Sequence, residues 1–133
     1  MISRWPVLVT LPVEADDCDG EGRLTDAAVG RLFAQARTSY FALCTTVDES
    51  TLEVQQTTVQ LGSPVTTGGV SVSVNVVEVF PETFTMTARF RADGAGDDSI
   101  AATGWCSLSP GGPVSTAMRD EFIALAHDAR HFH

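Results

Sequence analysis

Residues 16–40 read DDCDGEGRLTDAAVGRLFAQARTSY, and the predicted fold depends on this stretch more than on any other. It begins as a polar loop with three carboxylates, those of Asp16, Asp17 and Asp19. It continues with apolar residues at steps of three and four, which is typical of an amphipathic helix. The apolar stripe consists of Val29, Leu32, Phe33, Ala36 and Tyr40. Because the first N–H groups of a helix lack backbone partners, an acidic loop that leads into a buried helix is a candidate site for chemistry.

The same stretch indicates where the helix begins. Thr25 has a side chain of the type that accepts hydrogen bonds from the first N–H groups of a helix, so we predict it as the N-cap. Asp26 follows in the first turn, where a negative charge interacts favourably with the helix dipole. We expect the helix to run to about Cys44, before a polar break at residues 48–51.

Patterns typical of β-strands lie on both sides of this helix. Residues 70–76 alternate valine with serine and asparagine, and residues 84–91 alternate apolar with polar side chains. The predicted strands span residues 5–13, 52–65, 70–80, 84–92 and 100–108, and a closing helix spans residues 118–129. Proline and Gly/Asp-rich turns separate the strands.

The order of these elements predicts the fold class. Four strands follow the long helix in hairpin-like succession, which implies an antiparallel sheet. Pro6 and Pro12 cannot donate to a strand ladder, so the first strand is expected either to lie at a sheet edge or to end at Pro12. The helix must bury its apolar stripe on the sheet, which predicts an α+β domain.

Composition and charge narrow the function classes. With 44% hydrophobic and 19% charged residues, the 133-residue chain is predicted to be one globular domain, residues 1–133, with fraying at residues 1–4 and 129–133. The net charge of −9 argues against a nucleic-acid partner. No apolar run approaches the roughly 20 residues of a membrane span. Three cysteines without a C-x-x-C motif suit reduced thiols, so we expect a cytoplasmic protein.

Several short motifs occur in a defined order. Residues 5–7 (WPV) open the first strand, residues 17–22 (DCDGEG) form a D-x-D-x-x-G loop, residues 36–38 (ART) lie on the helix, and residues 58–65 (TVQLGSPV) end the second strand. In this order and spacing, residues 5–127 resemble the hotdog-fold thioesterases, in the group of 4-hydroxybenzoyl-CoA thioesterase and the bacterial short acyl-CoA thioesterases. The resemblance implies the hotdog fold, a five-stranded antiparallel sheet wrapped around a long central helix.

The resemblance also implies an activity and an assembly. Such proteins hydrolyse acyl-CoA or other acyl thioesters, and the resemblance implies no metal and no other cofactor. They pair sheets edge to edge into homodimers, which are often doubled to homotetramers, with the active sites at the dimer interface. An acidic chain is an unfavourable partner for an acidic carrier protein, which favours coenzyme A as the carrier.

The resemblance assigns roles to individual residues. Asp19, the second aspartate of D-x-D, corresponds to the catalytic carboxylate, which attacks the thioester carbonyl or activates water. The backbone N–H groups of Asp26 and Ala27, at the helix start, correspond to the donors that stabilise the oxyanion. The predicted substrate-binding residues are Gly22, Thr58, Arg89 and Arg91.

Two departures from the family pattern favour an alternative, non-catalytic function. Asp26 stands where relatives usually carry Tyr, His or Asn, and a carboxylate there opposes the developing negative charge. The turn at residues 80–83 lacks the basic residues with which some relatives hold the phosphates of coenzyme A. The alternative function is a non-catalytic hotdog protein that binds an acyl ligand or a protein partner. In that case the acidic loop is a solvated turn in which Asp19 only accepts hydrogen bonds.

Overall fold

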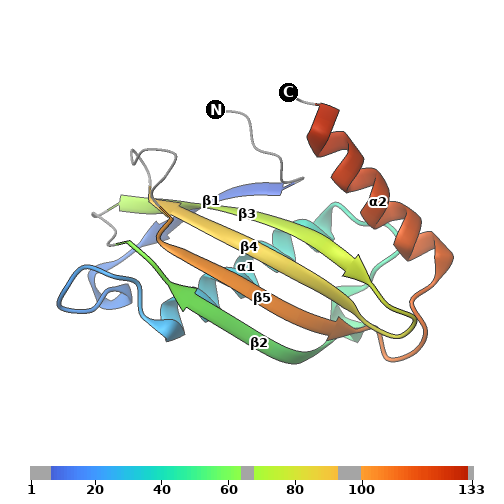
Figure 1. The fold of residues 1–133 in the computed structure, drawn as a ribbon, viewed down its shortest axis with the longest axis horizontal. Helices are drawn as coiled ribbons and strands as arrows, with labels where there is room; N and C mark the ends of the chain where they lie inside the picture. The colour runs from blue at the N-terminus through green and yellow to red at the C-terminus, as the bar shows by residue number, and fades with distance from the viewer. Residues whose placement is uncertain (1–6, 64–67, 93–99, 132–133) are drawn as a thin grey trace.

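The computed structural model describes residues 7–63, 68–92 and 100–131. Within these residues, five strands form one antiparallel sheet and two α-helices pack with it (Figure 1). The strands are β1 (Val7–Val13), β2 (Glu53–Leu61), β3 (Gly68–Val79), β4 (Phe84–Ala92) and β5 (Ala102–Ser109). The helices are α1 (Asp26–Ala42) and α2 (Thr116–His131), with short 3₁₀ helices at Ala15–Asp17 and Glu49–Thr51. The predicted α+β class is confirmed.

Helix α1 is the centre of the core, as its apolar pattern predicts. Thr25 caps the helix, because its Oγ1 accepts a hydrogen bond from the N–H of Ala28 at 3.1 Å. The stripe expected to face the sheet is buried in full: Val29, Leu32, Phe33, Ala36 and Tyr40. The helix ends at Ala42, slightly before the predicted end at Cys44.

The sheet has the strand order β1-β3-β4-β5-β2. Strand β1 lies at one edge, which is one of the two outcomes that its prolines predict. Strand β2 lies at the other edge and pairs with β5, so β2 and β3 do not form a hairpin. The predicted hairpin succession is therefore wrong at this connection. The alternation of side chains within a strand marks its buried face but carries no information about which strand becomes its neighbour.

Helix α1 covers one face of the sheet, which we call the inner face, and it lies behind the strands in Figure 1. Inner-face residues of β3 and β4 are buried: Val70, Val72, Val74, Val76, Phe84, Met86, Ala88 and Phe90. The intervening residues, mostly serine, threonine and arginine, point to the opposite, outer face. The predicted alternation is confirmed for both strands.

A glycine in β5 lets α1 approach the sheet. A Cβ atom at Gly104 would lie 2.7 Å from two ring carbons of Phe33, closer than any carbon–carbon contact allows. The Phe33 ring therefore fills the space of the missing side chain and packs edge-on against Phe90, with ring centroids 6.4 Å apart.

Helix α2 lies beside the end of β3 (Figure 1). Its Phe122 is buried, with the ring centroid 4.8 Å from that of Phe84. The neighbouring Glu121 carboxylate accepts hydrogen bonds from the backbone N–H groups of Thr45, at 2.8 Å, and Thr46, at 3.0 Å, and from both hydroxyls. Burial opposes ionisation of Glu121, but these hydrogen bonds outweigh it and lower the pKa to about 2.

Element boundaries differ modestly from the prediction. The second strand ends at Leu61 rather than at residue 65, and β5 begins at Ala102 rather than at residue 100. Helix α2 continues to His131, past the predicted end at residue 129 and into the segment expected to fray. The predicted start of the first strand, residues 5 and 6, lies outside the described residues.

Candidate functional site

The loop between β1 and α1 is built around the Asp19 side chain. Asp19 Oδ1 accepts hydrogen bonds from the backbone N–H groups of Glu21, at 2.8 Å, and Arg23, at 3.1 Å. The Asp19 N–H donates to the Arg23 carbonyl at 2.8 Å, and the Gly22 N–H donates to the Asp19 carbonyl at 3.1 Å. Gly22 has a positive φ of 81°, which favours glycine there. The exposed Asp19 therefore holds a tight turn through one oxygen, and no described residue donates to Oδ2.

Asp17 has a different environment from Asp19, although the two stand in one motif. The Asp17 side chain is buried and accepts hydrogen bonds from Arg31 Nη2 and from the Glu14 N–H, both at 2.9 Å. The Arg31 contact, followed by the Glu14 contact, lowers the pKa of Asp17 below its ordinary value, so the carboxylate is ionised. The Asp17 carbonyl also accepts from the Thr25 N–H at 2.9 Å. These bonds attach the loop to the helix that follows it.

The start of α1 presents two backbone donors. The Thr25 cap uses the N–H of Ala28, and no described residue accepts from the N–H groups of Asp26 and Ala27. Both residues are exposed. Unpaired N–H groups at a helix N-terminus stabilise a negative charge placed against them. Residues 19–27 therefore form one continuous segment that carries the Asp19 carboxylate and the two N–H groups at the helix start. Asp19 Oδ2 and both N–H groups have no hydrogen-bond partner among the described residues.

Cys18 is the other nucleophile type in this loop. Burial, and then the charges of Asp17 and Asp19, raise the pKa of the Cys18 thiol. A raised pKa disfavours the thiolate, which is the reactive form of cysteine. Cys18 is therefore not activated as a nucleophile in this loop.

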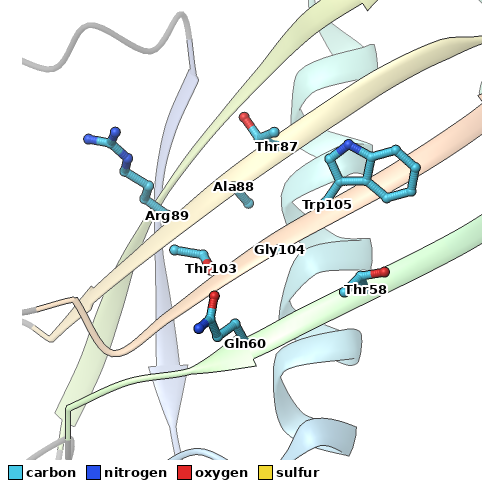
Figure 2. Close-up of a pocket in the computed structure, with 8 residues that line it drawn as sticks. All are labelled: Thr58, Gln60, Thr87, Ala88, Arg89, Thr103, Gly104 and Trp105. Atoms are coloured by element: carbon cyan, nitrogen blue, oxygen red, sulfur yellow. The ribbon is translucent and has the colours of Figure 1, made fainter.

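The other predicted site residues lie elsewhere. Thr58, on β2, and Arg89, on β4, line a hollow of about 370 Å³ on the outer face of the sheet (Figure 2). Arg91 lies two residues further along the outer face of β4 and does not line the hollow. The predicted residues thus form two groups: Asp19, Gly22, Asp26 and Ala27 in the loop and helix start, and Thr58, Arg89 and Arg91 on the outer face.

Sequence reasoning missed two features of these regions. The ion pair between the buried Asp17 and the exposed Arg31 joins residues 14 positions apart, and an aspartate does not signal burial. Trp105 lines the outer-face hollow with Thr87, Thr103 and Gln60. Alternation along the strand predicts that Trp105 points outward, but only the register between β2, β5 and β4 reveals which residues accompany it.

Two properties of the described residues bear on metal sites and on membrane spans. No cluster of three or more His, Cys, Asp and Glu side chains is placed to hold a metal ion in residues 7–63, 68–92 and 100–131. Neither helix of that part of the chain is both long and apolar enough to cross a membrane. The three cysteines are all free thiols.

Comparison with known proteins gives structural relatives. No family model matches the sequence, and no curated protein matches it. A thioesterase from Thermus thermophilus, solved with coenzyme A and Zn, is 26% identical, with a TM-score of 0.77 over 92% of this chain and 96% of that one. A thioesterase-superfamily protein from a Jannaschia species is 17% identical, with a TM-score of 0.76 over 92% of this chain and 84% of that one.

A third solved structure extends the comparison. A 1,4-dihydroxy-2-naphthoyl-CoA thioesterase from Synechocystis is 13% identical, with a TM-score of 0.67 over 85% of this chain and 95% of that one. At this identity the likeness concerns the fold. The resemblance to hotdog-fold thioesterases that the sequence motifs indicated is confirmed by these structures.

Proposed function

We propose that this hotdog-fold protein of the thioesterase superfamily hydrolyses acyl-CoA thioesters. One observation carries the proposal: the exposed Asp19 carboxylate keeps one oxygen free in the loop that leads into the unpaired N–H groups of α1. The likeness to a thioesterase that was solved with coenzyme A supports coenzyme A as the carrier of the acyl group. We propose the cytoplasm as the place of action, because the three free thiols suit a reducing compartment.

Asp19 is the proposed catalytic residue. Oδ2 attacks the thioester carbonyl carbon, or it takes a proton from a water molecule that attacks. In both routes the C–S bond breaks and the coenzyme A thiolate leaves. In the direct route, water then hydrolyses the acyl anhydride on Asp19, which releases the acid and restores the carboxylate.

The N–H groups of Asp26 and Ala27 are the proposed oxyanion donors. They gain in strength as negative charge develops on the carbonyl oxygen, and losing one such donor typically costs about 100- to 1000-fold in rate. The exposed Asp26 carboxylate opposes the same charge. Asp26→Asn is therefore expected to raise kcat while leaving both backbone donors in place.

Gly22 and the outer-face residues are the proposed substrate contacts. The absence of a side chain at Gly22 leaves the loop backbone open to a substrate that reaches Asp19. Thr58, Arg89 and Arg91 are proposed to contact the carrier end of the substrate rather than its acyl group. Their place on the outer face, away from α1, supports a role remote from the reacting carbonyl.

We propose that the protein is a homodimer, or a homotetramer built from such dimers, paired through β2. This strand lies at the sheet edge, and all of its residues except Val59 are exposed. An open edge strand offers unpaired N–H and C=O groups to a second copy. Measurement of the mass in solution by sedimentation tests the assembly, and a monomer at micromolar concentration contradicts it.

The activity is tested by release of free thiol from a panel of acyl-CoA esters. Asp19→Asn keeps an oxygen that can accept the two loop hydrogen bonds but removes the carboxylate, so turnover should fall by orders of magnitude while the fold persists. Asp16→Asn is the matched control, because Asp16 is an exposed carboxylate of the same loop. Equal turnover in the Asp19→Asn variant and the wild type would reject Asp19 as the catalytic residue.

The non-catalytic alternative is favoured by Asp26, whose carboxylate stands at the proposed oxyanion site. It predicts that acyl-CoA esters bind without thiol release. Calorimetric titration of wild-type protein with an acyl-CoA ester, combined with the thiol assay, separates the two functions.

A further inference from the structure

A second hollow, of about 430 Å³, lies between the end of β3 and α2. We call it the α2 hollow. Its lining is mostly apolar and includes Val76, Val77 and Val79 of β3 and Phe122, Ile123 and Ala126 of α2. Strands β4 and β5 lie between β3 and the β2 edge (Figure 1). The α2 hollow is therefore a surface distinct from the proposed β2 contact.

A β-bulge shapes the β3 wall of the α2 hollow. The pairing with β4 shifts between Val76 and Glu78, so that Val77 has no partner residue on β4. Beyond the bulge, Val79 stands opposite the buried Phe84. Without the shift, strand alternation would place Glu78 on the inner face together with Val76. The bulge therefore keeps the Glu78 charge out of the core and leaves Val77 on the wall of the hollow.

Exposed apolar side chains gather at the α2 hollow. In the part of the chain that the structure describes, the exposed large apolar residues are Leu43, Val54, Leu61, Val77, Phe80 and Ile123. Val54 and Leu61 belong to β2, the proposed dimer edge. Val77 and Ile123, which are 47% and 59% exposed, line the β3 wall and the α2 wall of the hollow. A hollow with such walls is typical of a protein–protein contact.

The α2 hollow also carries one charge of each sign. Glu78, on β3, and Arg119, on α2, both line it and are both exposed. Neither forms an ion pair with a residue that the structure describes. A surface that holds an acid and a base without ion-pair partners is complementary to itself. A two-fold axis brings Arg119 of one protomer to the partner's Glu78, and the reverse.

We propose that the α2 hollow is a contact surface for a second copy of this chain, related to the first by a two-fold axis. Ile123 of each protomer enters the hollow of the other and buries its apolar side chain against the partner's Val77. Arg119 of each protomer pairs with the partner's Glu78. Together with the proposed β2 contact, this pairing joins two dimers into a tetramer. The α2 contact itself rests on neither the proposed activity nor the β2 contact.

Sedimentation of the full chain at micromolar concentration tests the contact. Ile123→Glu places a charge in the apolar contact, so the mass of the assembly should fall to half. The product is a dimer where the β2 contact also forms, and a monomer where it does not. Ala124→Glu is the matched control and should leave the mass unchanged, because Ala124 is exposed on α2 and does not line the hollow. Equal masses for wild type and Ile123→Glu overturn the proposal.

Charge reversal tests the pairing across the two-fold axis. Glu78→Arg and Arg119→Glu each bring like charges together at both ion pairs, so each should raise the dissociation constant about tenfold or more. A mixture of the two variants should associate as wild type does, because each copy then meets opposite charges on the other. This recovery requires contacts between protomers, since an ion pair within one chain stays broken in the mixture. A mixture that associates no better than either variant alone overturns the proposed pairing.

Two controls keep the result independent of folding and of turnover. If a reversed variant does not fold, Glu78→Gln and Arg119→Gln replace the pair, and wild-type affinity in both overturns the ion pairs. The wild-type Tm should rise with protein concentration, and Ile123→Glu should lose this dependence. A Tm that Ile123→Glu lowers equally at every concentration means that the same chain covers the hollow, which overturns the proposal. None of these measurements uses thiol release, so failure of the proposed activity leaves them unaffected.

Discussion

Arg31 Nη2 lies 2.9 Å from the Asp17 carboxylate and connects the second turn of α1 to the loop that precedes the helix. The Asp17 side chain is 8% exposed and that of Arg31 is 52% exposed, so the pair lies at the boundary of the core. Through this contact, the helix start and the Asp19 turn keep a defined relative position. The pair is therefore a positioning device for the proposed site.

Removal of the Asp17 charge is expected to lower both stability and turnover. Asp17→Asn should cost about 1.5 to 3 kcal/mol in the free energy of unfolding at pH 7, the range for hydrogen bonds to charged groups. The folded pKa of Asp17 lies below the unfolded value of 3.8, so its stabilisation is present above that pH and is lost as the pH falls through the folded pKa. The difference between variant and wild type should therefore shrink below about pH 4.

Urea unfolding at several pH values measures this effect, with Asp16→Asn as the exposed control. The kcat of Asp17→Asn should fall while its pH profile keeps the wild-type shape, because Asp17 does not touch the substrate. A variant as stable as wild type at pH 7 would contradict the structural role of the pair.

Glu121 is expected to hold α2 on the domain. Glu121→Ala removes the acceptor for two backbone N–H groups and two hydroxyls of Thr45 and Thr46, and should cost about 2 kcal/mol. The pKa of Glu121 falls from 4.5 to about 2 on folding, so this stabilisation is present above pH 4.5 and is lost as the pH falls towards 2. Thermal unfolding measures the loss, and Asp120→Asn, on the exposed side of α2, should change Tm little. Hydrogen exchange should quicken first in α2.

Gly104→Ala is expected to destabilise the core. The added Cβ lies 2.7 Å from the Phe33 ring, so the ring or the strand must move, at a typical cost of about 1 to 3 kcal/mol. Gly112→Ala is the control, because nothing lies within 4 Å of a Cβ there. A Phe33→Leu change in the Gly104→Ala background should recover part of the loss in a double-mutant cycle. Additive effects would show that the two positions do not contact each other.

Gly30→Ala is expected to stabilise the protein. Gly30 lies inside α1 and nothing lies within 4 Å of its added Cβ, so alanine should gain about 0.5 to 1 kcal/mol from its higher helix propensity. Gly111→Ala should do the opposite, because Gly111 has a φ of 82°. A rise in Tm for the first and a fall for the second are the expected results. A fall for Gly30→Ala would mean that another subunit fills the space beside the helix.

The local pattern of apolar and polar residues was sufficient to predict much of the fold. The valine alternation of β3 and the stripe of α1 predicted which side chains are buried, because each reports the period of its own element. The Thr25 cap was equally predictable, since donor and acceptor lie three residues apart. Contacts between distant segments were not predictable from the local pattern. The β2–β5 pairing and the Glu121 contact with Thr45, 76 positions away, depend on the assembled fold.

The candidate site, like the fold, could be predicted from the sequence only in part. The motif distinguishes Asp19 from its neighbours only by family resemblance, and the three carboxylates of the loop look alike in sequence. Burial separates them: Asp17 is enclosed by Arg31, while Asp16 and Asp19 are exposed. The assignment of Thr58 and Arg89 to one hollow with Trp105 required the strand register, which a sequence pattern does not specify.

The two oxygens of Asp19 differ in their contacts, and this difference has a consequence for descent. Oδ1 shapes the turn, and Oδ2, to which no described residue donates, carries the proposed reaction. Asparagine retains an oxygen for the turn, and a single nucleotide change converts an aspartate codon into an asparagine codon. A lineage can therefore lose the chemistry in one mutation while its loop, helix and sheet stay intact. Descendants that keep this fold with asparagine at position 19 are expected to persist as binding proteins.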